Sequence, residues 1–289
     1  MPENTYTWKV GDIECVAISD GSFPYPPQLV FANIPPDALE GELRARHLPT
    51  DHVQGTYTCL LIKTGSKKVL LDTGAGSMVA STGALLSNLQ EVGVNARDIG
   101  VVILTHAHPD HIGGAVDAEG RPAFPNARYV MFKEEWDFWT ADHVDLDAME
   151  LPEEIKSALI LGTARRCLPP LKPQIELLEG EREIAPGIWS IRAPGHTPGH
   201  MAVGISSGRD SVLHIVDAVL HPLHLEHPAW RNAFDLVQGQ AAETRRRILD
   251  RAATDRTKIL AYHFPFPTLG HIVSRGVAWA WEPIALERA

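Results

Sequence analysis

The chain has 289 residues, of which 44% are hydrophobic and 21% charged, and this is the composition of a globular protein with a substantial core. The formal net charge of -10 argues against nucleic acid as a partner. Three widely spaced cysteines without a Cys-x-x-Cys pair argue against a disulfide framework and against a cysteine-based zinc site. We therefore expect one large α/β domain over residues 1–289.

The N-terminus and the hydropathy of the chain bear on its location. The first residues, Met-Pro-Glu-Asn, lack the basic and apolar regions of a signal peptide. No apolar run approaches the length needed to cross a bilayer. We expect a soluble, cytoplasmic protein with no membrane partner.

The first part of the chain has strand-like patterns on both sides of a Pro-rich segment. Strands are expected at residues 6–10, 13–19, 57–64 and 67–72, the last two joined by a Gly65-Ser66 turn. Residues 24–36 predict an irregular loop, and its aromatic part at 23–31 either overhangs a pocket or mediates dimer contacts. Residues 1–50 are thus interpreted as an N-terminal strand-and-loop extension near the pocket or a dimer contact.

The rest of the chain alternates between strand and helix patterns. Residues 100–105 form a short apolar run bounded by Gly and polar residues, which is typical of a buried central strand. Further strands are expected at 128–132, 175–178, 188–193, 201–206, 212–216 and 258–262. Helices are expected at 85–92, 134–143, 152–167 and 240–253. Each half is β-rich and then alternating, which predicts two packed sheets with helices outside.

A dense cluster of metal-binding side chains follows the central strand, in the run His106-x-His108-x-Asp110-His111. Imidazole and carboxylate together suit Zn, Fe, Co or Mn. Two histidines two residues apart can point together from an extended segment, and Gly113-Gly114 lets the chain bend just after the cluster. The alternative is a surface loop that contains histidines by chance, which composition alone predicts in well under ~1% of chains of this size.

Three further candidate ligands each close a predicted strand. His196 follows residues 188–193, Asp217 follows 212–216, and His263 follows 258–262. Ligands in α/β proteins are usually bound at strand ends, so this shared placement indicates one site.

These residues resemble the metallo-β-lactamase superfamily, whose pattern is His-x-His-x-Asp-His, then a later His, an Asp and a last His. All seven positions are present in order, and Asp72 matches the family's early Asp at a strand end. The resemblance covers residues 72–263 and implies an αβ/βα four-layer sandwich, with two mixed sheets and helices on their outer faces.

The resemblance also implies the role of each residue. The ligands of one metal ion would be His106, His108 and His196. The ligands of the other would be Asp110, His111 and His263. Asp217 would bridge the two ions together with a hydroxide, and Asp72 would orient a ligand His by a hydrogen bond.

The implied activity is that of a dinuclear hydrolase. Two divalent ions, zinc in the first place with Mn, Co or Fe as alternatives, would activate the bridging hydroxide to cleave an ester, lactone or phosphotriester. Asp110 would be catalytic, holding the nucleophile or moving its proton. We expect a small-molecule substrate and a homodimer.

The segment after the last ligand suggests a branch of the family. The run from His263 to His271 resembles methyl parathion hydrolase-like phosphotriesterases, which have lactonase and arylesterase side activities. Phe264 and Phe266 are therefore candidates for the wall of an apolar pocket, and the equally weighted alternative is that they are core residues. The homoserine lactonase branch has a Tyr three residues after the bridging Asp, where this chain has Leu220, and His221 is a candidate donor to the substrate instead.

Two other activities on the same scaffold remain open. A glutathione-thioester hydrolase of the glyoxalase II type would need basic residues near the C-terminus, where Arg275 is the candidate. An iron-dependent persulfide dioxygenase would lack a ligand of the second ion. Among the remaining residues, His200 and His271 are expected to be buried and hydrogen-bonded, His214 is expected to be structural, and Trp136 and Trp139 are expected to pack.

Overall fold

The computed structural model describes residues 4–285, which form two seven-stranded sheets. The first sheet has its strands in chain order: β1 (Thr5–Val10), β2 (Ile13–Tyr25), β3 (Val53–Thr64), β4 (Lys67–Leu71), β5 (Val101–Ile103), β6 (Arg128–Phe132) and β7 (Ile175–Leu178). The second runs in reverse order from β14 to β8: β8 (Glu183–Ala185), β9 (Ile188–Arg192), β10 (Met201–Ser207), β11 (Asp210–His214), β12 (Lys258–Leu260), β13 (Leu269–Arg275) and β14 (Ala278–Pro283). Both sheets mix parallel and antiparallel pairs.

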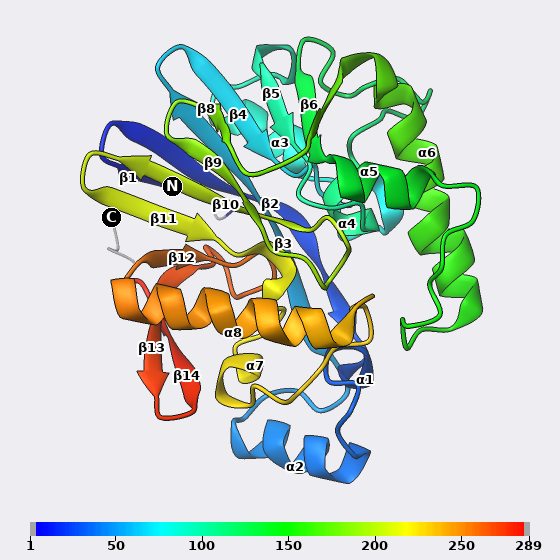
Figure 1. Cartoon of the computed structure of the whole chain (residues 1–289), viewed down its shortest axis with the longest axis vertical. Coiled ribbons are helices and arrows are strands. Elements are labelled where there is room, and N and C mark those ends of the chain that lie inside the picture. Colours follow the sequence, from blue (N-terminus) through cyan, green and yellow to red (C-terminus); the bar gives the residue numbers. More distant parts are fainter. Residues whose placement is uncertain (1–3, 286–289) are drawn as a thin grey trace.

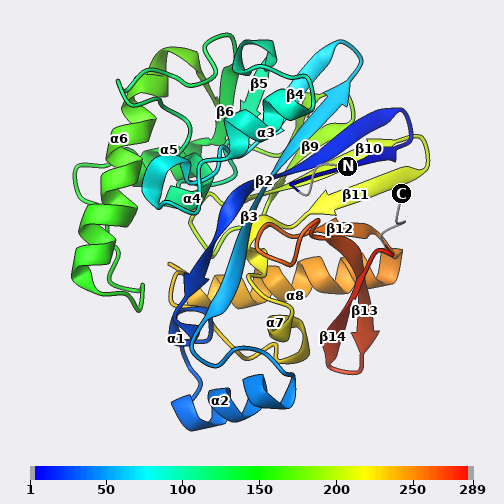
Figure 2. The ribbon, with the colours of Figure 1, turned by 180° about the vertical axis from the view of Figure 1, so that it is seen from behind.

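Helices cover the outer faces of the two sheets (Figures 1 and 2). The α-helices of residues 4–285 are α1 (Pro27–Val30), α2 (Pro36–Ala45), α3 (Leu85–Glu91), α4 (Pro109–Ile112), α5 (Lys133–Thr140), α6 (Gly162–Leu171), α7 (Leu223–Glu226) and α8 (Gln238–Asp255), and of these α1 and α2 lie at one end of the sandwich. A π-helical stretch, Ile155–Leu161, leads directly into α6. No helix within the range 4–285 is long and apolar enough to cross a membrane.

Alternating side chains along the strands build the layers. On β3, Leu60 and Ile62 point into the core between the two sheets, whereas Leu61 packs under the helices of the first sheet. On the other side, Ile248 and Leu249 of α8 pack against the outer face of the second sheet. The molecule is therefore a sandwich of helices, sheet, sheet and helices, as predicted.

The N-terminal segment is more regular than the sequence indicated. The prediction of an irregular loop over 24–36 is wrong in part, because β2 runs on to Tyr25 and α1 follows it. α2 was not predicted at all, and it buries only two apolar side chains, Leu39 and Leu43, too few for a clear helical pattern. Both side chains pack with Leu223 of α7 in a small separate core.

Candidate metal centre

Every predicted metal ligand lies just beyond the end of a strand. His106 and His108 are on the loop after β5, and α4 then carries Asp110 and His111. The remaining three, all from loops of the second sheet, are His196 after β9, Asp217 after β11 and His263 after β12. The structure brings all seven together at one edge of the sandwich, and all seven are buried.

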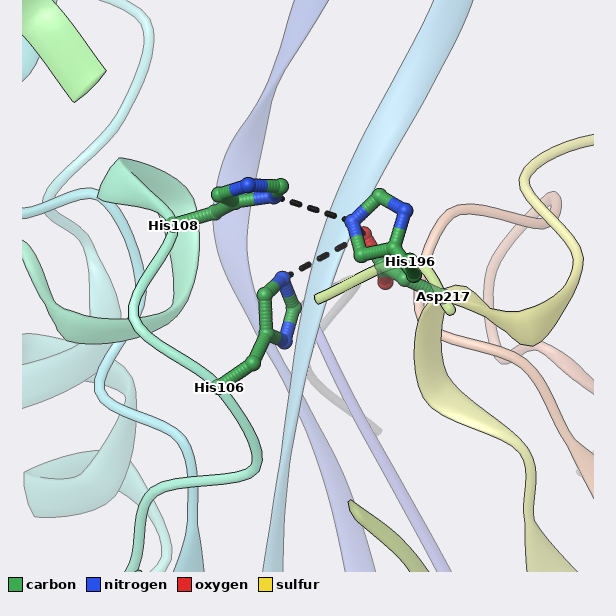
Figure 3. Close-up of side chains that lie close together, drawn as sticks. All are labelled: His106, His108, His196 and Asp217. Atoms are coloured by element: carbon green, nitrogen blue, oxygen red, sulfur yellow. Dashed lines mark hydrogen bonds and ion pairs between the residues drawn. The ribbon is translucent and has the colours of Figure 1, made fainter. Parts of the chain in front are cut away.

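The first group of ligands is formed by His106, His108, His196 and Asp217 (Figure 3). One atom of each lies within 4.8 Å of one atom of every other. The His196 ring nitrogen Nε2 is 2.9 Å from Nδ1 of His108 and 3.3 Å from Oδ2 of Asp217. His106 Nε2 is 3.8 Å from the same carboxylate oxygen.

The second group is formed by Asp110, His111 and His263. Oδ2 of Asp110 lies 3.4 Å from Nε2 of His263 and 3.7 Å from Nε2 of His111. Asp217 reaches this group as well, with its Oδ1 3.4 Å from His111 Nε2 and its Oδ2 3.2 Å from His263 Nε2. Its carboxylate therefore stands between the two groups, which are the same two sets that the family resemblance implies.

Unpaired polar atoms show that the residues fit metal ions. Nε2 of His106 and His111 and Oδ1 of Asp217 are buried without a hydrogen-bond partner among the described residues, and Nδ1 of His108 faces Nε2 of His196 in the same group. Leaving such an atom unpaired costs about 1–3 kcal/mol. Two ligands of a tetrahedral ion with bonds of about 2.1 Å lie about 3.4 Å apart, close to the separations observed here. Nitrogen and carboxylate donors suit zinc, cobalt, manganese or iron, so each group fits a divalent cation.

The electrostatics of the cluster favour the neutral form of His106 and His108 and the ionised form of Asp217. Burial keeps the pKa of His106 and His108 well below its ordinary value, so both rings are neutral. Burial alone would raise the pKa of Asp217, but His111 and His263 outweigh it and hold the pKa well below its usual range. The Asp217 carboxylate is therefore ionised.

Asp72 occupies the orienting position that the resemblance implied. Its Oδ2 is 2.8 Å from Nδ1 of His111, which leaves Nε2 of that ring facing the ligand cluster. Asp72 has a left-handed backbone with φ of 58°, and its carboxylate also accepts hydrogen bonds from the amide and hydroxyl of Thr105. The strand end after β4 is thus tied to the strand end after β5.

A second orienting carboxylate, Asp235, was missed by the sequence analysis. Its Oδ1 lies 2.8 Å from Nδ1 of His196, and its Oδ2 lies 3.4 Å from the buried guanidinium of Arg245. The pKa of Asp235 is below its ordinary value because His196 and Arg245 outweigh the effect of burial. Asp235 belongs to an irregular loop before α8 and to no motif, so no sequence signal pointed to it.

Glu135 of α5 was missed as well, although it connects the two main ligand loops. It is fully buried and accepts hydrogen bonds from the amides of Ala107 and Gly199, the hydroxyl of Thr197 and the indole of Trp139, at 2.7–2.9 Å. Ala107 lies between two ligands, and Thr197 follows His196. One carboxylate therefore fixes the spacing of both loops.

The structure changes the interpretation of the other histidines. His200 donates from Nδ1 to the carbonyl of Ala193, and its Nε2 accepts the amide of Asp217, so it holds the backbone of that residue in place. His214, expected to be structural, is the last residue of β11, and its Nδ1 accepts the amide of Val216, whose φ is 49°. His271 is only half-buried on β13, contrary to expectation.

A cavity of about 250 Å³ opens over both ligand groups. Its apolar wall comes mainly from three regions: β2, β3 and α1; the stretch Ile155–Leu161; and the loop before α8. These wall residues are Phe23, Tyr25, Leu29, Val30, Val53, Tyr57, Met78, Val79, Ile155, Leu159, Ile160, Leu220 and Phe234. Five predicted ligands also line it: His108, Asp110, His196, Asp217 and His263.

The predicted pocket residues do not line this cavity. Phe264 is fully buried in the core under α8, where its ring packs edge-on against Trp281. Phe266 is half-buried outside the cavity wall. His221 is half-buried and packs against Phe31 rather than the cavity, and its Nδ1 accepts the amide of Leu223. The run after His263 turns back into the second sheet, which takes its aromatic side chains away from the ligands.

Comparison with known proteins agrees with this geometry. Residues 53–263 match the metallo-β-lactamase superfamily. The chain is 26% identical over 181 residues to an N-acyl homoserine lactonase of a Bacillus species, covering 55% of this chain and 62% of that protein. It thus spans about three fifths of the length of such curated relatives.

Two solved structures resemble the whole chain. The dizinc quorum-quenching lactonase AidC, in complex with its product, superposes with a TM-score of 0.92 and 28% identity over 99% of both chains. The hydrolase AbOPH superposes with a TM-score of 0.87 and 27% identity over 100% of both chains.

Proposed function

The chain belongs to the metallo-β-lactamase superfamily, and from this premise we propose that it is a dinuclear metal-dependent hydrolase of small apolar lactones and esters. The observation that carries the proposal is the pair of buried ligand groups, joined by Asp217, at the base of an apolar cavity. Such a cavity, with few polar groups converging on it, is the usual form of a small-molecule site.

The chain's own residues divide the work of the reaction. Two divalent ions would supply an activated water and polarise the carbonyl oxygen of the substrate. His106, His108 and His196 would hold one ion, Asp110, His111 and His263 the other, and Asp217 would bridge them. Asp72 and Asp235 hold Nδ1 of His111 and His196, so that Nε2 of each ring would be free to bind its ion.

Asp110 is the residue we assign to proton movement. It lines the cavity, and its side chain is 12% exposed, more than that of Asp217 at 4%. A carboxylate there can accept a proton from the attacking water. It can then return the proton to the alkoxide that leaves when the carbon–oxygen bond breaks, so that no proton is gained or lost.

Lactones and carboxylic esters come first because both N-acyl homoserine lactonases and a product-bound lactonase resemble this chain. Phosphotriesters are the second candidate, since an apolar wall with Leu220 in it accepts an uncharged triester equally well. No Lys or Arg stands among the cavity-lining residues of the range 4–285, which disfavours the acidic groups of a glutathione thioester. A persulfide dioxygenase would lack a ligand of the second group, whereas all three lie together here.

The test is a substrate panel on protein stripped of metal and reloaded with zinc, manganese or cobalt. The panel contains γ-lactones, N-hexanoyl homoserine lactone, aryl esters, a paraoxon-type triester and a glutathione thioester. We expect metal-dependent turnover of the lactones and aryl esters, rising with the apolar chain of the substrate. Oxygen uptake coupled to turnover, or no hydrolysis of any of these compounds with any of the metals, would overturn the proposal.

A further inference from the structure

The cavity contains two tyrosines that the reaction scheme above does not use. Tyr25 is near the end of β2, and Tyr57 is on the adjacent strand β3. Apart from the proposed ligands, the cavity-lining side chains that carry a hydrogen-bond donor are these two phenols and the exposed amide of Gln54. Of these three side chains, Tyr57 is buried, Tyr25 is half-buried and Gln54 is exposed. A substrate oxygen inside the cavity would therefore meet the two phenols.

The two phenols form a close pair beside the second ligand group. Their hydroxyl oxygens are 2.6 Å apart. The ring of Tyr57 lies edge-on to the imidazole of His263, with centroids 5.7 Å apart. Gly55 makes room for the arrangement, because a Cβ there would lie 2.7 Å from the ring of Tyr25 and 3.7 Å from the His263 ring.

A count of protons shows that one donor is left over. Two phenols have two O–H groups, and the hydrogen bond between them uses one. Neither oxygen has another hydrogen-bond partner among the described residues. Either phenol can donate the hydrogen bond that joins the pair. The phenol that accepts this bond keeps its own O–H free to donate elsewhere.

We propose that the Tyr25–Tyr57 pair donates this free proton as a hydrogen bond to the carbonyl oxygen of the bound substrate. This rests on the proposed function. It gives the cavity the donor that Leu220 does not provide, from a different part of the chain. The bond strengthens as negative charge builds on that oxygen during attack, so it acts on kcat more than on KM. The inner hydrogen bond polarises the outward one and makes it stronger.

Because either phenol can supply the free O–H, the loss of one phenol should matter much less than the loss of both. Tyr25→Phe leaves Tyr57 with a free O–H, and Tyr57→Phe leaves Tyr25 with one, so each single variant keeps a donor. We expect each to lower kcat by no more than about 5-fold and the double variant by about 100-fold, the range seen when an oxyanion donor is removed. A single variant as impaired as the double would assign the outward proton to that one phenol.

The experiment compares the zinc-loaded wild type, both single variants, the double variant and Tyr6→Phe. Tyr6 is a half-buried phenol on β1, outside the cavity, and serves as the matched control. Zinc content and thermal stability are measured for each protein, and kcat and KM are measured with aryl esters and γ-lactones. A double variant with full zinc content whose kcat stays within about 5-fold of the wild type would overturn the proposal.

A binding measurement separates this proposal from the proposed function. Hexylphosphonate has an apolar tail and an oxyanion head, and its binding is followed by calorimetry without any turnover. We expect the double variant to bind it about 10-fold more weakly than the wild type, about the effect of losing one hydrogen bond to a charged group. If the wild type hydrolyses esters and the double variant keeps both its kcat and its affinity for hexylphosphonate, the tyrosine proposal alone fails. If the wild type hydrolyses nothing but binding still depends on the pair, the proposed function alone fails.

Discussion

Because Asp72 and Asp235 each orient one ligand histidine, the binding of each metal ion should be weakened separately by substituting one of them. Asp235→Asn removes the charged partner of His196, and Asp72→Asn removes that of His111. A hydrogen bond to a charged group contributes about 1.5–3 kcal/mol, and each 1.4 kcal/mol is a factor of ten in affinity. We therefore expect zinc to bind about 10- to 100-fold more weakly in the affected group, the usual effect of losing such a partner.

Competition with a chromophoric chelator measures the two stepwise zinc affinities of each variant. Crystals grown at one equivalent of zinc then show by anomalous scattering which group keeps its ion. In Asp235→Asn this should be the group with Asp110, and in Asp72→Asn the group with His106. Asp137→Asn is the control, since Asp137 is exposed on α5 and pairs with the likewise exposed Lys133. The reasoning is refuted if both variants lose the same ion, or if neither affinity changes.

Three further variants test the rest of the site. His263→Ala should lose one of two bound zinc ions and most of the hydrolytic activity while keeping its fold, and unchanged metal analysis would contradict the assignment of the second group. Glu135→Gln should lower the free energy of unfolding by at least about 2 kcal/mol in urea titrations, because an amide satisfies only two of four donors. A loss no larger than in the control Glu134→Gln, whose half-buried carboxylate pairs with Arg192, would argue against it. Gly195→Ala should abolish soluble folded protein, because a Cβ there collides with the backbone of α8, whereas Gly208→Ala, also at positive φ but with open space around it, should cost only about 1–2 kcal/mol in unfolding measurements.

The sequence predicted the layers and the ligand cluster because both depend on local patterns. Strand β6 has the predicted bounds, and α8 extends the predicted helix by two residues at each end. These elements are decided by the alternation or helical spacing of their own residues. The ligands were recognisable because metal chemistry restricts the residue types, and because each ligand follows a strand.

The cavity wall depended on contacts that no local pattern contains. Phe264 was assigned to the cavity by resemblance, yet the chain turns after His263 and buries that ring against Trp281 in the hairpin of β13 and β14. Tyr25 and Tyr57 come from strands separated by α1 and α2, which pair side by side, and Gly55 leaves room for the ring of Tyr25. Asp235 meets His196 in the same non-local way.

The fold therefore places the metal ligands and the substrate wall in different parts of the chain. The ligands follow short strand ends that are held by buried carboxylates, where each displaced atom leaves a polar group unpaired. Most of the wall comes from the long antiparallel strands β2 and β3 and from the π-helical stretch Ile155–Leu161, whose cavity residues are largely apolar. Apolar side chains of similar volume exchange there at low cost. It follows that changes in this wall should alter which ester is hydrolysed while the affinity for zinc stays constant. Changes at Asp72, Glu135 or Asp235 should instead lower the affinity for zinc and with it the hydrolysis of every substrate alike.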